Sequence, residues 1–227
     1  MVDFLTTTPR YDDVTFYLQQ WTLEVMEEAR KKGKNTLHLN EGEVTKTKFE
    51  KTIRKHKPKF ILINGHGSER EIAGQGNIRR REDGSAFSDE IILEVGDNED
   101  ITSGSIVYAR ACSSSAQLGK ACVEKGAIAY MGYKGRFVFF VDGNKATRRK
   151  EDKIANYFKE ITNSVPLTIL KGNTTSDAVE RSKLATIKTI ERLESSEYND
   201  AEAQAILPFL YLDLVFLDLQ GNASAKI

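Results

Sequence analysis

The chain has 227 residues, 40% of them hydrophobic, which is enough to bury the core of one large domain. Its 33 basic and 33 acidic residues cancel, so we expect neither nucleic acid nor a membrane as a partner. The N-terminal residues lack the basic and apolar regions of a signal peptide, and Pro208 and Asp213 interrupt the longest apolar stretch. We therefore expect a cytoplasmic protein that folds as a single domain over residues 1–227.

Apolar strands alternate with amphipathic helices along most of the chain. The patterns predict, in order, a strand at 3–8, a helix at 15–33, a strand at 36–39, a helix at 44–58, strands at 59–64, 90–95 and 105–112, a helix at 115–126, strands at 127–133 and 136–141, helices near 147–162, 176–195 and 200–211, and an apolar element at 212–219. The continuous apolar run Phe60–Ile63 is typical of a strand covered on both faces. The sequence therefore predicts an α/β fold, with a mainly parallel sheet and helices on both faces.

Two of these strands each end in one reactive side chain. His66 follows the strand 59–64 in the stretch Asn-Gly-His-Gly, and Cys112 ends the strand 105–112. Chemistry gathers at the carboxyl ends of parallel strands, and neighbouring strands would bring both side chains to one edge of the sheet. An imidazole there can take the proton of a thiol and later protonate a leaving amine. The pattern predicts a cysteine nucleophile with a histidine base.

Small residues around these positions fit the same chemistry. Gly67 would let its N–H approach a reacting carbonyl closely, and this N–H could hold an oxyanion together with that of Cys112. A helix opening directly after Cys112 would favour the thiolate with its positive end. Taken singly, a histidine after a strand is more often a turn residue, and a cysteine that ends a strand more often belongs to the core. Their combination favours catalysis.

The two strand ends, "FILINGHG" and "IVYARAC", resemble the paired signature of the clan CD cysteine peptidases, which include caspases, metacaspases, separases, gingipains and CHAT-domain proteases. The stretch "ACSSSAQLGKACVEKGAIAYMGY" is similar to the gingipain and CHAT pattern in particular. The resemblance extends from Phe4 to the C-terminus and implies a caspase-like fold and peptide-bond hydrolysis through a thioester. It makes His66 the base, Cys112 the nucleophile, and the amides of Gly67 and Cys112 the oxyanion hole.

The resemblance also implies a cleavage preference. In these families the residue two before the nucleophile, here Arg110, points into the primary specificity pocket, and it shares a side of the strand with Cys112. An arginine attracts a carboxylate, so we expect cleavage after Asp or Glu. The alternative is a structural ion pair between Arg110 and Glu94 or Asp89. Asp142, in a predicted loop after the last apolar strand, is a candidate site of autoprocessing.

Residues 68–100 interrupt the alternation with a polar stretch rich in Gly and Asp. Long segments of this kind are usually functional, so we predict an excursion that borders the active site. Cys122 is expected to pack inside a helix. Arg70 takes the last glycine position of a G-x-G-x-x-G pattern, which argues against a dinucleotide site. Metal-ligand spacings are absent, and we expect neither a metal nor another cofactor.

The sequence thus predicts a cysteine endopeptidase that acts on a protein or peptide substrate by limited proteolysis. A regulatory partner or a homodimer fits the same prediction. The alternative is a peptidase-like module that only binds or regulates, because a fold does not secure a function. The presence of both His66 and Cys112 favours the enzyme.

Overall fold

The computed structural model describes residues 2–80, 86–142, 145, 151–195 and 204–227. Its strands are β1 (Phe4–Thr8), β2 (Thr36–Asn40), β3 (Phe60–Asn64), β4 (Glu71–Ala73), β5 (Ile78–Arg80), β6 (Ala86–Ser88), β7 (Ile91–Glu94), β8 (Ile106–Arg110), β9 (Ala129–Tyr133) and β10 (Leu217–Gly221). Its helices are α1 (Asp13–Lys31), α2 (Lys46–His56), α3 (Leu118–Glu124), α4 (Lys153–Leu170), α5 (Thr175–Glu194) and α7 (Leu207–Phe216), with short 3-10 turns η1 (Glu41–Glu43) and η2 (Glu99–Thr102). Within these described ranges, no helix is both long and apolar enough to cross a membrane.

Six strands form one central sheet in the order β10-β9-β8-β3-β1-β2. Every neighbouring pair is parallel except β10 with β9, which is antiparallel at the edge. Two small antiparallel pairs, β4 with β7 and β5 with β6, stand apart from this sheet. The chain is therefore an α/β protein with a mixed, mostly parallel sheet, as the alternation of strands and helices predicted.

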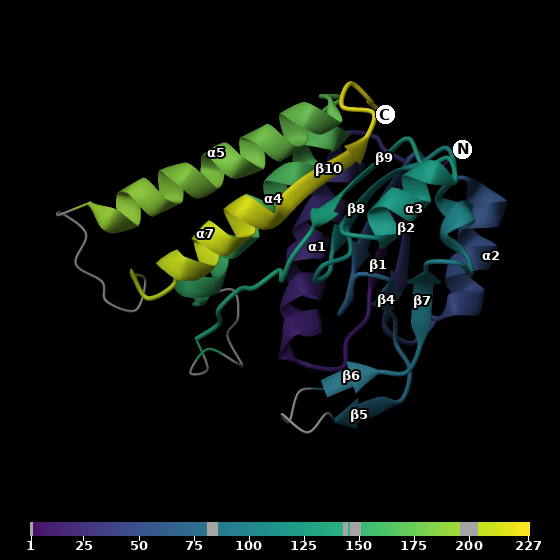
Figure 1. Ribbon diagram of the computed structural model, residues 1–227, viewed down its shortest axis with the longest axis horizontal. Helices are drawn as coiled ribbons and strands as arrows, with labels where there is room; N and C mark the ends of the chain where they lie inside the picture. Colours follow the sequence, from purple (N-terminus) through teal and green to yellow (C-terminus); the bar gives the residue numbers. More distant parts are fainter. Residues whose placement is uncertain (1, 81–85, 143–144, 146–150, 196–203) are drawn as a thin grey trace.

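Side chains on the strands alternate between two cores on opposite faces of the sheet. In β3, Phe60 and Leu62 point into the larger core, which α1, α4, α5 and α7 complete. Ile61 and Ile63 point into the other core, which α2 and α3 complete. Figure 1 shows α2 and α3 on one side of the sheet, and α4, α5 and α7 on the other. Because both faces are covered, β3 carries an uninterrupted apolar run.

Several predicted elements differ in the structure. The expected strand at 136–141 pairs with no other strand, because its aromatic side chains pack between helices instead. The helix expected near 147–162 begins at Lys153, where Asp152 caps it by accepting a hydrogen bond from the Ala155 amide. The apolar element at 212–219 divides between α7 and β10. The start of the helix expected at 200–211 falls partly outside the described residues, and α7 begins with Pro208 in its first turn.

Candidate active site

The loops that carry His66 and Cys112 leave the sheet side by side. β3 and β8 are neighbours in register, with Asn64 opposite Arg110. A Cβ atom on Gly67 would lie 2.9 Å from the Cβ of Ala111 and 3.2 Å from the carbonyl oxygen of Cys112. The structure therefore brings the two predicted loops into backbone contact at the carboxyl edge of the sheet.

His66 and Cys112 line one cleft of about 440 Å³. The other residues of its wall come from the same loops, from the excursion after β3 and from the segment after β9: Gly67, Ser68, Glu71, Ala73, Phe87, Ser88, Ile91, Ser113 and Arg136. Several of these lie within residues 68–100, so the excursion borders the cleft of the two predicted catalytic residues. Residues 81–85 of the excursion lie outside the described part of the chain.

Asp12 orients the histidine. Its Oδ2 atom lies 2.6 Å from Nε2 of His66. Burial disfavours the charged form of this carboxyl, but the hydrogen bonds from His66 and from the Thr15 amide outweigh burial, and the pKa of Asp12 lies below its usual value. An ionised carboxylate can only accept, so the proton between the two groups belongs to His66 Nε2. The other ring nitrogen, Nδ1, makes no hydrogen bond within the described residues and is left to act as a base.

Local structure holds Asp12 in place. Asp12 is the N-cap of α1, and its second oxygen, Oδ1, accepts a hydrogen bond of 2.8 Å from the Thr15 amide. The Thr15 hydroxyl accepts in return from the Asp12 amide, which completes a capping box. The ring of Tyr11 lies 5.8 Å from that of His66, measured between ring centroids. One oxygen of Asp12 thus starts a helix and the other fixes the imidazole. Asp12 was not predicted from the sequence, although an acidic capping box follows β1, the strand next to β3.

The thiol of Cys112 is half-buried and donates a hydrogen bond of 3.4 Å to the carbonyl oxygen of Phe137. Burial raises the pKa of this thiol, and the carboxyl of Asp213 acts in the same direction, whereas Arg136 opposes them. The thiol is therefore protonated at neutral pH in this conformation, and its proton is engaged by the main chain.

Two backbone amides of the candidate site have no acceptor on another described residue. Neither the Gly67 nor the Cys112 N–H donates a hydrogen bond to any described residue. Gly67 and Ile72 form an antiparallel β-bridge. The hydrogen bonds of this bridge are made by the adjacent residues: the Ala73 amide donates to the carbonyl of His66, and the Ser68 amide donates to that of Glu71. Both residues predicted to form the oxyanion hole line the cleft.

The helix predicted to begin directly after Cys112 begins later. α3 starts at Leu118, and the intervening residues form turns. Ser113 has φ of +55°, which is uncommon outside glycine, and its amide donates to the carbonyl of Gly135 at 2.7 Å. This tight turn replaces the helix end, so the expected contribution of a helix dipole to thiolate formation is wrong.

Arg110 does not reach the cleft. Its side chain is fully buried under α1 and α4, with a hydrogen bond of 2.5 Å to Oδ1 of Asn163 and a longer one to the hydroxyl of Thr22. It shares a face with Cys112, as the strand alternation predicted, but the helices cover it. The alternative ion pair is also wrong, because Asp89 binds Arg79 instead and no ion pair joins Arg110 to Glu94. Sequence position alone could not reveal that α1 and α4 pack over this residue.

The other predicted residues occupy simpler surroundings. The Asp142 amide donates to the carboxylate of Asp152 at 2.8 Å, and the bond that autoprocessing would cleave, to Gly143, lies outside the described residues. Cys122 is fully buried in α3, as expected, and burial raises its pKa to about 12. Within the described residues, no three His, Cys, Asp or Glu side chains gather as metal ligands would.

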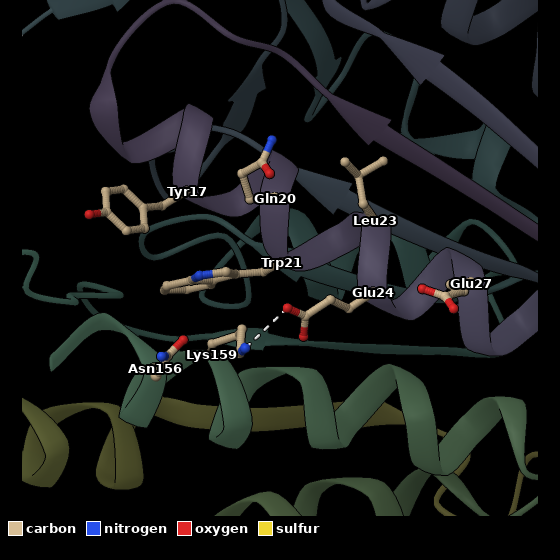
Figure 2. A pocket seen from close by; sticks show the side chains of 8 residues that line it. All are labelled: Tyr17, Gln20, Trp21, Leu23, Glu24, Glu27, Asn156 and Lys159. Atoms are coloured by element: carbon tan, nitrogen blue, oxygen red, sulfur yellow. Dashed lines mark hydrogen bonds and ion pairs between the residues drawn. The ribbon is translucent and has the colours of Figure 1, made fainter. Parts of the chain in front are cut away.

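A second hollow of about 300 Å³ lies between α1 and α4 (Figure 2). Tyr17 and Trp21 line it together with an ion pair of 3.0 Å between Glu24 and Lys159. None of the predicted catalytic residues lines this hollow, so the cleft with His66 and Cys112 is the candidate active site.

The sequence matches no protein-family model, and no curated protein matches it either. The resemblance to clan CD peptidases therefore depends on the motifs and on the arrangement of the residues that carry them.

Proposed function

We propose that this protein is a cysteine peptidase with a caspase-like fold that cleaves peptide bonds through a thioester. The observation that carries the proposal is that His66, oriented by Asp12, and Cys112 line the same cleft. A mainly parallel sheet that delivers both residues from adjacent strands is the arrangement that the resemblance implies. The amides of Gly67 and Cys112, which donate to no other described residue, lie in the two loops where an oxyanion hole is expected.

The reaction would proceed in two halves. Nδ1 of His66 takes the thiol proton, and the thiolate of Cys112 attacks the substrate carbonyl, whose oxygen becomes an oxyanion held by the amides of Gly67 and Cys112. The C–N bond breaks as the imidazolium protonates the leaving amine, which leaves a thioester on Cys112. His66 then takes a proton from water, the resulting hydroxide attacks the thioester, and the thiol is restored as the acid product leaves. Asp12 stabilises the imidazolium in both halves.

We propose cleavage after acidic residues, carried by Arg136 in place of Arg110. Arg136 lines the cleft, is exposed, and makes no hydrogen bond or ion pair within the described residues. Arg136 and Cys112 line the same cleft, and the charge of Arg136 acts to lower the pKa of the thiol. The cleft is also lined by Glu71, whose carboxylate would attract a basic substrate residue. If the protein cleaves after basic residues, Glu71 rather than Arg136 determines the specificity.

A peptide library tests the proposal directly. Incubation with the wild-type protein should give cleavage after Asp or Glu, and Cys112→Ala and His66→Ala should abolish it, while Cys122→Ala leaves it unchanged. Mass mapping of the incubated protein itself tests autoprocessing after Asp142. Absence of cleavage in every sample, with slow and equal alkylation of Cys112 and Cys122 in the wild type and in Phe139→Ala alike, would favour the alternative of a silent binding or regulatory module.

A further inference from the structure

The segment Phe137–Asp142, here called the strap, lies against the thiol of Cys112. It follows β9 and pairs with no strand of the described part of the chain. The carbonyl of Phe137 accepts the hydrogen bond from the Cys112 thiol. The Cys112 thiol thus donates its proton to a carbonyl of the strap, whereas catalysis requires it to donate to Nδ1 of His66.

Two carboxyl groups hold the backbone of the strap. The Val138 amide donates to Oδ1 of Asp213 in α7 at 3.1 Å. At the other end, the Asp142 amide donates to Oδ2 of Asp152, the N-cap of α4, at 2.8 Å. The Tyr17 hydroxyl donates to the same oxygen of Asp152 at 2.7 Å. Groups from α1, α4 and α7 therefore act together on a segment that has no sheet partner.

Aromatic contacts seat the strap between these helices. Phe137 stacks on Tyr133 with ring centroids 4.5 Å apart, and Phe139 lies 4.7 Å from Trp21. Trp21 also lines the hollow between α1 and α4 that Figure 2 shows. Such contacts stabilise a segment through apolar burial and ring geometry. Removing one ring should therefore measurably weaken the packing of the strap.

Asp213 anchors the strap from a buried position in α7. It is only 6% exposed, and the Val138 amide is its one hydrogen-bond donor within the described residues. Burial raises the pKa of this carboxyl well above its usual value, so it is held in an unfavourable environment for ionisation. The hydrogen bond from Val138 therefore ties the strap to a buried group of α7.

We infer that the strap is an autoinhibitory element, held closed by the Asp213 latch and the Phe139 contact, which must leave Cys112 before substrate can react. The biological role of the strap rests on the proposed peptidase function, but its effect on Cys112 can be measured without peptide cleavage. Access to Cys112 can be followed with iodoacetamide, a small neutral reagent that alkylates thiolates and needs no peptide recognition. Cys122, fully buried in α3, is the internal control.

The experiment compares alkylation rates of Cys112 by mass spectrometry in folded variants. Phe139→Ala should raise the rate about tenfold, the change that corresponds to about 1.4 kcal/mol lost from the closed state. Asp213→Ala should raise it more than Asp213→Asn, because the carboxamide keeps an oxygen for the Val138 amide and isolates the effect of charge. Leu212→Ala, on the exposed side of α7, should leave the rate unchanged.

The same variants are measured in a His66→Ala background, which has no catalytic base. If the strap variants are alkylated faster in this background, autoinhibition is supported even when no peptide is cleaved. Absence of peptide cleavage would then count against the proposed peptidase function and not against the strap. Unchanged alkylation in both Phe139→Ala and Asp213→Ala, with cooperative unfolding retained and Cys122 still protected, overturns the inference. Peptide cleavage by the wild type in that case would leave the proposed function standing.

Discussion

The carboxylate of Asp12 and the imidazole of His66 are joined by a hydrogen bond of 2.6 Å, and the same carboxylate caps α1. The histidine is therefore positioned by a helix N-terminus that the sheet itself holds in place. Because Nε2 carries the shared proton, Nδ1 is the nitrogen left for the thiol. Asp12, His66 and Cys112 form a candidate triad drawn from the loops after three neighbouring strands, β1, β3 and β8.

The first prediction concerns the role of Asp12 in turnover. Asp12→Asn should lower kcat for peptide cleavage by about 100-fold, within the range that general acid–base catalysis contributes, because the imidazolium loses its charged partner. Asparagine is also a good N-cap, so the helix should survive. Asp13→Asn, which changes the neighbouring carboxylate, is the matched control. Equal kcat values for the two variants would remove Asp12 from the mechanism.

The second prediction follows from the lowered pKa of Asp12. A carboxyl whose pKa is lower in the folded state stabilises that state above its unfolded pKa of about 3.9, and this contribution is lost as the pH falls through the folded value. Urea unfolding at several pH values should show wild type more stable than Asp12→Asn at pH 6, with the difference shrinking below pH of about 4. A difference that stays constant with pH would mean that the Asp12 carboxylate is not preferentially stabilised by folding.

The third prediction concerns the contact between the two loops. A Cβ on Gly67 would overlap Ala111, so Gly67→Ala should cost about 1–3 kcal/mol of unfolding free energy and displace His66 from Cys112. Peptide cleavage should fall even where the protein remains folded. Gly42→Ala is the control, since a Cβ at Gly42 meets no atom within 4 Å. Full activity in Gly67→Ala would show that the loops need not approach so closely.

The fourth prediction separates the two arginines. Arg136→Glu should shift cleavage away from acidic residues and towards basic ones. It reverses the charge of Arg136, the only Lys or Arg among the described residues that line the cleft. Arg110→Met should leave the cleavage preference unchanged, because the Arg110 side chain is fully buried and bonded to Asn163. Profiles from one peptide library, measured for both variants, check this. A changed preference in Arg110→Met alone would restore the specificity role first assigned to Arg110.

Much of the fold was accessible from hydrophobic periodicity. The run Phe60–Ile63 predicted a strand covered on both faces, and the two cores confirm this. The loops of His66 and Cys112 were predicted to meet because parallel neighbours end at the same edge, and the register of β3 with β8 brings them together. Both predictions depend only on residues within a strand or directly after it, so they could be made from the sequence.

The predictions that were wrong or incomplete concern residues whose contacts are distant in sequence. Arg110 was expected in the cleft because its side of the strand was known, but its burial depends on Thr22 and Asn163, which lie far away along the chain. The strap was expected to be a strand because its apolar residues have β propensity, which packing against helices overrides. Asp12 carried a visible signal as an acidic N-cap, but linking it to His66 required knowing that β1 lies next to β3.

The central claim is that Cys112 is a nucleophile activated by His66, and labelling with a thiol-reactive peptide electrophile that carries Asp before its reactive group tests it most directly. The rate at each cysteine is read by mass spectrometry in wild type, His66→Ala and Phe139→Ala. We expect Cys112 to react far faster than Cys122, the rate to fall in His66→Ala, and Phe139→Ala to react faster than wild type. Slow labelling of Cys112 that does not depend on His66, in the wild type and in the strap variant alike, would contradict the claim.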